Sequence, residues 1–190
     1  MSLTAQAPAI VRWTLRLEQA EALDGPVGAL EPKVTALFGT GTRGSVLRGD
    51  WLGHAVHPLL TDVVIGTWTS ATLLDLLGGP GSSAAAQRLL GTGLFAVGPT
   101  AWTGWAEWSA ASIRDKRVGL VHAATNGLAI SIYAASYVAR RRGRHGAGAR
   151  LALAGAAISG AGAYLGGHLA HARKVASRSR AFESTPLEEE

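Results

Sequence analysis

The segment that decides the fold is VGLVHAATNGLAISIYAASYVA, residues 118–139. No Asp, Glu, Lys or Arg occurs between Gly119 and Ala139. A helix of this length is long enough to cross the hydrocarbon core of a bilayer. A soluble four-helix bundle, the main alternative, should instead carry charged residues along one face of each helix. The segment therefore favours a membrane span.

Three further apolar stretches have a similar length, namely residues 58–78, 89–111 and 151–172. Pro58 suits the first turn of a helix, where its missing N–H costs nothing, and the Gly78-Gly79-Pro80-Gly81 segment indicates a helix end. Pro99 predicts a kink in the second stretch, and Gly162-x-x-x-Gly166 in the last stretch allows close helix approach. The connections are about ten residues or fewer, so neighbouring helices should be antiparallel. We find no sequence repeat.

The expected fold is all-α: an integral membrane four-helix bundle with N-terminal amphipathic, interfacial helices. Residues 1–50 mix apolar and acidic positions and predict one or two helices that lie on the membrane or pack on the bundle. Residues 51–175 form the predicted transmembrane domain. Residues 176–190, which end in Glu188-Glu189-Glu190, are expected to be a flexible polar tail.

Composition excludes several classes of site. The chain has no Cys, which removes disulfides, thiolate metal ligands, iron–sulfur ligation and covalently attached haem. Charged residues are 16% of the chain, against about 25% in soluble domains. The net charge of +5 comes with arginines that cluster beside apolar stretches, as in Arg140-Arg141-Arg142. Membrane proteins place basic residues in this way, so we expect no nucleic-acid partner.

Basic residues near the span ends predict the orientation. One side receives Arg43, Arg48, Arg114, Lys116, Arg117, Arg173, Lys174, Arg178 and Arg180. The other side receives Arg88, Arg140, Arg141, Arg142, Arg144 and Arg150. The larger set marks the cytoplasmic side, so both termini are predicted to be cytoplasmic.

Four alternating crossings put the start of the first and third spans and the end of the second and fourth spans on one side of the bilayer, where polar residues gather. These are His54, His57, Asp62, Glu107, His122, Asn126, His168 and His171. Asp62, His122 and His168 each lie about sixteen residues, or roughly 24 Å, from the far end of their own span. Ionisable residues inside a membrane are costly, so a group of them at one depth indicates a functional site.

Such a cluster supports three kinds of chemistry. First, imidazoles from facing helices can be axial ligands of haem b; the cofactor-binding candidates are His57, His122, His168, His54 and His171. Second, His57, His122 and His168 with Asp62 or Glu107 form a ligand set for one iron, copper or zinc ion. Third, carboxylates beside imidazoles can relay protons without a cofactor. The alternative without chemistry is a set of helix-end histidines that face lipid headgroups.

Two motifs resemble a known family. The segment Gly53-His54-Ala55-Val56-His57-Pro58-Leu59 is followed by Asp62, Ile65-Gly66 and Trp68, and the last span contains Leu165-Gly166-Gly167-His168-Leu169. Over about residues 45–175 the chain resembles an uncharacterised bacterial membrane family, domain of unknown function 2231, with its G-H-P-x-H-P, D-x-P-I-G-x-W and G-G-H-L motifs. Ala55 and Val64 replace prolines of these motifs, which affects backbone stiffness more than ligation.

The resemblance implies a multi-pass protein of the bacterial inner membrane with a redox role, because relatives are often fused to, or encoded beside, Rieske or cytochrome-like domains. Without Cys, this chain would need a separate Rieske or cytochrome-type partner. Our first hypothesis is an electron-transfer subunit of a membrane oxidoreductase. The alternatives are a non-catalytic scaffold for a redox partner and a small proton-coupled transporter. Its surroundings are the lipid bilayer, and a homo-oligomer is compatible with the sequence.

Overall fold

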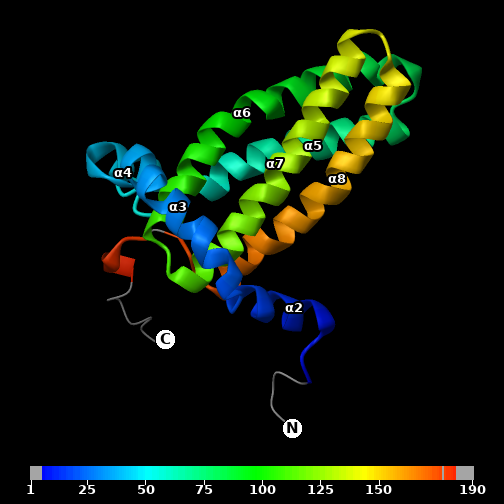
Figure 1. Cartoon of the computed structure of the whole chain (residues 1–190). Helices are drawn as coiled ribbons and strands as arrows, with labels where there is room; N and C mark the ends of the chain where they lie inside the picture. The colour runs from blue at the N-terminus through cyan, green and yellow to red at the C-terminus, as the bar shows by residue number, and fades with distance from the viewer. Residues whose placement is uncertain (1–5, 177, 183–190) are drawn as a thin grey trace, which may run out of the picture.

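The computed structural model describes residues 6–176 and 178–182, and helices form nearly all of this part of the chain. Four long helices lie side by side: α5 (His57–Leu77), α6 (Ser83–Ala110), α7 (Ile113–Arg141) and α8 (His145–Gly167). They form two antiparallel hairpins, α5–α6 and α7–α8, each joined by a short turn at the same end (Figure 1). We call the end with these turns the far end and the opposite end the near end.

The expected helices are present with small differences in their bounds. The predicted stretches 58–78 and 118–139 fall almost entirely within α5 and α7. α6 continues through Pro99 and begins six residues before the predicted stretch 89–111. α8 begins six residues before the last stretch, 151–172, and the final five residues of this stretch form a π-helical turn, η4 (His168–Ala172). The all-α prediction is confirmed.

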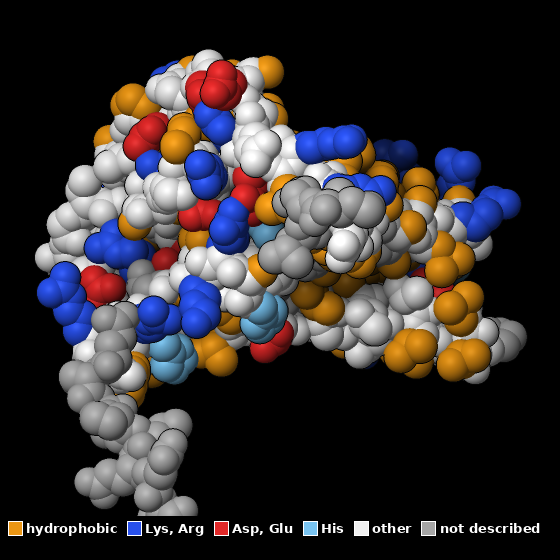
Figure 2. All heavy atoms as spheres, turned by 90° about the horizontal axis from the view of Figure 1, so that it is seen from below, with side chains coloured by type: hydrophobic (Ala, Val, Ile, Leu, Met, Phe, Trp, Pro, Cys, Tyr) orange, Lys and Arg blue, Asp and Glu red, His pale blue; other side chains and the backbone are white. Residues whose placement is uncertain are grey.

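Among the described residues, α5 and α7 are the two helices that are long and apolar enough to cross a membrane. Their apolar windows are mostly unburied, and the four long helices expose large apolar side chains such as Leu73, Phe95 and Leu128. Figure 2 shows exposed hydrophobic side chains away from the end where charged side chains gather. An exposed apolar helix surface of this kind is compatible with contact to the hydrocarbon chains of lipids. The prediction of a four-helix transmembrane bundle is supported for α5 and α7, and crossing by α6 and α8 stays a prediction.

Large side chains fill the far half of the hairpins. Trp68 of α5 stacks on Tyr133 of α7, with ring centroids 4.0 Å apart. Closer to the turns, Arg140 of α7 pairs with Asp75 of α5 through both terminal guanidinium nitrogens, Nη1 and Nη2. The Arg140 side chain is almost fully buried and lies against Gly148 of α8, where a Cβ would come within 2.5 Å of its Cγ. A buried charge pair is tolerated in this setting because each charge has its partner.

The N-terminal residues cover the near end. The described residues of this region form α2 (Ala9–Glu18), α3 (Asp24–Val34) and α4 (Gly41–Arg48). α2 packs on α7, α3 packs on α6 and α7, and α4 packs on α6 (Figure 1). The interpretation that residues 1–50 contain helices that pack on the bundle fits this arrangement, although residues 1–5 lie outside the described part. Of the expected tail 176–190, residue 177 and residues 183–190, including the three terminal glutamates, also lie outside it.

Ion pairs attach this N-terminal cap to α7. Arg117 donates to both carboxylate oxygens of Asp24 at 2.7 Å, and Lys116 donates to Glu31 at 2.6 Å. The Arg117 hydrogen bonds hold the pKa of Asp24 below its ordinary value. Basic residues that the sequence placed at a membrane boundary therefore also connect two parts of the fold.

Candidate functional site: a cavity between the two hairpins

A cavity of about 370 Å³ lies in the near half, between the two hairpins. All four long helices contribute to its wall, which is mostly apolar and rich in small residues such as Ala101, Gly104, Ala123 and Ala163. Residues 175–176 close part of it at the near end. Its volume is within the range of small-molecule and cofactor sites.

His57, the first residue of α5, lines this cavity. Its Nδ1 lies 2.9 Å from the carbonyl oxygen of Thr100 on α6. A carbonyl oxygen only accepts hydrogen bonds, so the neutral ring carries its proton on Nδ1 and has a lone pair on Nε2. The ring packs on Gly104, where a Cβ would come within 2.8 Å of the His57 Cε1. A residue larger than glycine would push the imidazole away.

His122 of α7 has the same arrangement against α8. Its Nδ1 lies 2.9 Å from the carbonyl oxygen of Gly162. Its ring packs on Gly166, where a Cβ would lie 2.9 Å from Cε1. Nε2 accepts a hydrogen bond of 3.0 Å from the side-chain amide of Asn126. Binding of a metal at this nitrogen requires the Asn126 amide to turn aside.

The two imidazoles thus share the form in which histidine binds metals. In metal sites the ligating ring usually donates its other N–H to a backbone carbonyl or a carboxylate, which fixes the tautomer and the ring orientation. Both rings line one cavity and are close enough to interact electrostatically. The structure therefore brings His57 and His122 together from opposite hairpins, with Nε2 as the nitrogen suited to ligation.

Of the two carboxylates proposed as ligands, one lies at this cavity. Glu107 of α6 lines the wall and is 9% exposed. Asp62 lies on an exposed face of α5 and is not part of the wall. Among the described residues, no group of three or more His, Asp or Glu side chains is arranged to hold a metal ion. The wall thus contains two imidazoles, the buried carboxylate of Glu107 and the partly buried carboxylate of Asp115 in one largely apolar cavity.

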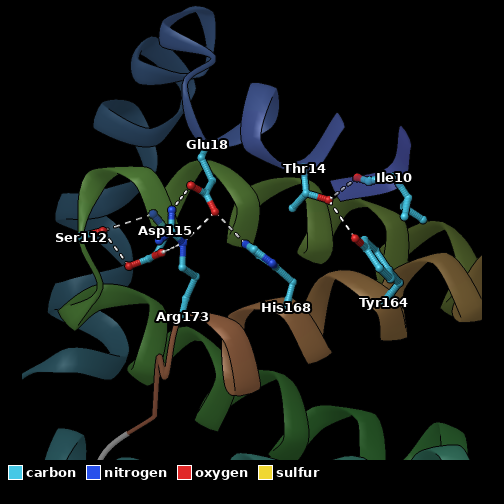
Figure 3. A network of polar contacts seen from close by, with 8 residues as sticks. All are labelled: Ile10, Thr14, Glu18, Ser112, Asp115, Tyr164, His168 and Arg173. Atoms are coloured by element: carbon cyan, nitrogen blue, oxygen red, sulfur yellow. Dashed lines mark hydrogen bonds and ion pairs between the residues drawn. The ribbon is translucent and has the colours of Figure 1, made fainter. Parts of the chain in front are cut away.

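His168 lies elsewhere, because it is paired with the N-terminal cap. Its Nε2 lies 2.7 Å from the Glu18 carboxylate of α2, which also accepts hydrogen bonds from Arg173 (Figure 3). Glu18 is 2% exposed, and beside it the hydroxyls of Thr14 and Tyr164 are 3.1 Å apart. His168 therefore helps to attach α2 to the end of α8, and it does not line the cavity with His57 and His122.

His54 and His171 line a second pocket, of about 480 Å³, next to the first. Four residues line both pockets: Ala55, Pro58, Ala170 and Ala176. Lys174 and Arg178 complete the polar side of the second pocket. Histidine and basic side chains lie close together on the face shown in Figure 2. The five histidines expected at one site are thus divided among the cavity, the second pocket and the cap.

Sequence reasoning missed the groups that position His57, His122 and His168. The carbonyls of Thr100 and Gly162 carry no side-chain signal, and the pairing of Glu18 with His168 joins residues 150 positions apart. Gly104 and Gly166 each lie four residues after the carbonyl that their histidine contacts. That spacing becomes meaningful once the partner helices are known.

Comparison with known proteins identifies a family for this chain. A family described as "Predicted membrane protein (DUF2231)" matches residues 53–179, from the first histidine motif to beyond η4. No curated protein and no solved structure matches the chain. The matched range contains His57, His122 and the helices that surround the cavity, whereas the cap formed by α2, α3 and α4 precedes it.

Proposed function

This chain belongs to the DUF2231 family of predicted membrane proteins, and on that basis we propose that it is an integral membrane electron-transfer subunit in which His57 and His122 bind haem b or a single transition metal ion. The main support is the matched pair of imidazoles: each donates Nδ1–H to a carbonyl of the next helix. The Nε2 lone pair faces a ligand at His57, and at His122 it does so once the Asn126 amide turns aside. When bound, such a group would supply one-electron chemistry.

The surrounding residues suit this role. The cavity wall is largely apolar, so water is restricted around the bound group, a condition that helps to set its potential. Glu107 is the buried carboxylate of the wall and is placed to exchange a proton when the charge of the site changes. Asp62, on the outer face of α5, has no part in the proposed site.

The test is to purify the full-length protein in detergent, record a reduced-minus-oxidised spectrum and measure bound metals. We expect a reducible centre whose spectrum changes in His57→Ala and in His122→Ala and which is lost in the double variant His57→Ala/His122→Ala. His145→Ala is the matched control, because His145 begins α8 at the far end. A colourless, metal-free protein that still supports its host's respiration would exclude the proposal.

A non-catalytic membrane scaffold for a separate redox protein is the second candidate. It is favoured by the polar cap, which ion pairs hold on the near end and which precedes the matched family range. A scaffold would keep its function in His122→Ala. It would lose assembly when Gly162 or Gly166 is changed, because a Cβ at either position would press on a side chain of α7, Asn126 or His122.

A further inference from the structure

The two hairpins have corresponding contacts at corresponding positions. His57 and Trp68 of α5 correspond to His122 and Tyr133 of α7, each 65 residues later. Each of these rings packs on a glycine of the following helix, and the glycines of the two hairpins are 62 residues apart: Gly93 and Gly155, Gly104 and Gly166. Each histidine also donates to the carbonyl four residues before its glycine. The same local structure is therefore built twice.

Burial follows the same correspondence. The buried positions of α5, which are Val64, Trp68 and Ala71, correspond to Ala129, Tyr133 and Ser136 of α7. On the second helices, Ala86, Leu90, Gly93 and Thr103 of α6 correspond to Gly148, Ala152, Gly155 and Leu165 of α8. Two hairpins that bury the same faces against each other are related by an approximate two-fold axis along the helices.

Contacts between corresponding residues locate this axis. Trp68 stacks on its counterpart Tyr133, and Asp75 pairs with Arg140, which is also 65 residues later. Residues related by a two-fold rotation touch each other only near the axis. The axis therefore passes between α5 and α7, and in the near half it enters the cavity between His57 and His122.

We propose that the four long helices are a duplicated hairpin and that the cavity on their axis holds an iron porphyrin, bound on its two faces by Nε2 of His57 and His122, with its carboxylates in the second pocket. This inference rests on the proposed function and selects between its two cofactor classes. A porphyrin supplies four nitrogens to its iron, so the protein needs to supply one ligand on each face. Two imidazoles related by a two-fold axis meet that need.

A bare metal ion fits these residues less well. Zinc sites, for example, take at least three protein ligands, and the described residues offer no such group. The wall has room for a flat ring, because small residues line it on facing helices and a Cβ at Gly127 would meet no atom within 4 Å.

The second pocket adds an observation that is independent of the two imidazoles. It shares four wall residues with the cavity, so a group that extends out of the cavity reaches it. Its polar wall contains His54, His171, Lys174 and Arg178. Cationic side chains favour carboxylates through charge-assisted hydrogen bonds. The joined pockets thus match a ligand with an apolar planar body and an anionic edge.

The experiment is to reconstitute the full-length, detergent-purified protein with haemin and, separately, with haemin dimethyl ester, whose carboxylates are blocked. We expect one haemin per chain with the spectrum of six-coordinate, low-spin iron. We expect the ester to bind at least about tenfold more weakly, because a charge-assisted hydrogen bond is lost. The Lys174→Ala/Arg178→Ala double variant should lose this preference. The control Arg141→Ala/Arg142→Ala, at exposed far-end positions, should keep it.

His57→Ala or His122→Ala should each convert the bound haem to a five-coordinate, high-spin form, and added imidazole should restore the low-spin spectrum. Circular dichroism and size-exclusion chromatography report whether each variant folds, and the imidazole rescue itself requires a folded site. If the protein binds a metal ion through both histidines and takes up no haemin, the porphyrin inference is wrong and the electron-transfer proposal stands. Equal affinity for haemin and its ester in the wild type would exclude the assignment of the second pocket. Binding of neither metal nor haemin excludes both proposals.

Discussion

The far half and the near half of the two hairpins have the same backbone arrangement, but the far half is a packed core and the near half contains a cavity. In the far half, corresponding residues are large or charged and touch across the axis, as Trp68 does with Tyr133 and Asp75 with Arg140. In the near half, the corresponding histidines pack on glycines of their own hairpins, the wall is rich in glycine and alanine, and a cavity is left. Side-chain size at corresponding positions therefore decides whether the hairpins form a packed core or a binding site.

Charge is handled differently in the two halves as well. Asp75 and Arg140 neutralise each other inside the protein, which suits a structural contact. His57 and His122 are positioned by backbone carbonyls, and their second ring nitrogen makes no ion pair; that of His122 accepts a hydrogen bond from the Asn126 amide. The filled far half also argues against the proton-coupled transporter, because its aromatic stack and core side chains occupy the space between the hairpins that a path would need.

Arg140→Met should have the largest effect on stability, because it leaves Asp75 buried without its partner. We expect a loss of about 3–5 kcal/mol in the free energy of unfolding. Denaturant titration of the detergent-purified protein measures it. Arg141→Met is the control, because Arg141 is the next residue and is exposed, and it should change the free energy of unfolding little. The variant Asp75→Asn/Arg140→Met should recover part of the loss. Equal stability of Arg140→Met and the wild type would show that the pair has no structural role.

Gly104→Ala and Gly166→Ala test the near half. Each new Cβ would lie within 3 Å of an imidazole carbon, so we expect a loss of about 1–3 kcal/mol from overpacking together with weaker ligand binding. Gly160→Ala on α8 is the matched control, because its Cβ would meet nothing within 4 Å. The control should be neutral or stabilising, since alanine favours helix. Thermal unfolding and ligand titration on the same samples separate the two effects.

Exchange of the two stacked aromatics tests the correspondence between the hairpins. Trp68→Tyr alone leaves space, and Tyr133→Trp alone overfills it. The double variant keeps the total volume and places each ring on a glycine, Gly93 or Gly155. We expect the double variant to lie within about 1.5 kcal/mol of the wild type and to be more stable than either single variant. A double variant less stable than both would mean that the two positions are not equivalent.

Acid should weaken the attachment of the cap. The hydrogen bonds from Arg117 lower the pKa of Asp24 from its ordinary value of 3.8, so the unfolded chain takes up this proton at a higher pH than the folded protein does. The stabilisation is complete above pH 3.8 and is lost as the pH falls through the lower folded value. Thermal unfolding between pH 6 and pH 3 measures it, and Asp24→Asn should remove this component. An unchanged pH profile in Asp24→Asn would contradict the assignment. This is the smallest effect, because the Asp24 side chain is partly exposed.

The sequence predicted much of the fold because a membrane span has a strong local signal. Residues 118–139 contain no Asp, Glu, Lys or Arg, and the whole segment lies within helix α7. The histidine motif around His57 also predicted the family, which the match confirms. Bounds were less accurate where a helix extends beyond its apolar part, as α6 does at Ser83. Polar residues at a helix end carry no hydrophobic signal.

The duplicated hairpin was not visible in the sequence. Corresponding positions share burial and contact, as Leu90 and Ala152 do, but rarely the same residue type. The grouping of the histidines also needed the structure. Five of them share one side of the predicted topology, yet His168 points to Glu18 of a helix that precedes the matched family range.

By itself the sequence determined the helical class, the long apolar helices and the common end of the bundle at which five histidines lie, because these follow from local hydropathy and from the alternation of the chain. The tertiary structure alone decided which imidazoles share a cavity, which nitrogen each one presents and which charges neutralise each other. These depend on the rotation of each helix about its own axis and on carbonyl groups of its neighbour. A linear pattern does not encode either of them.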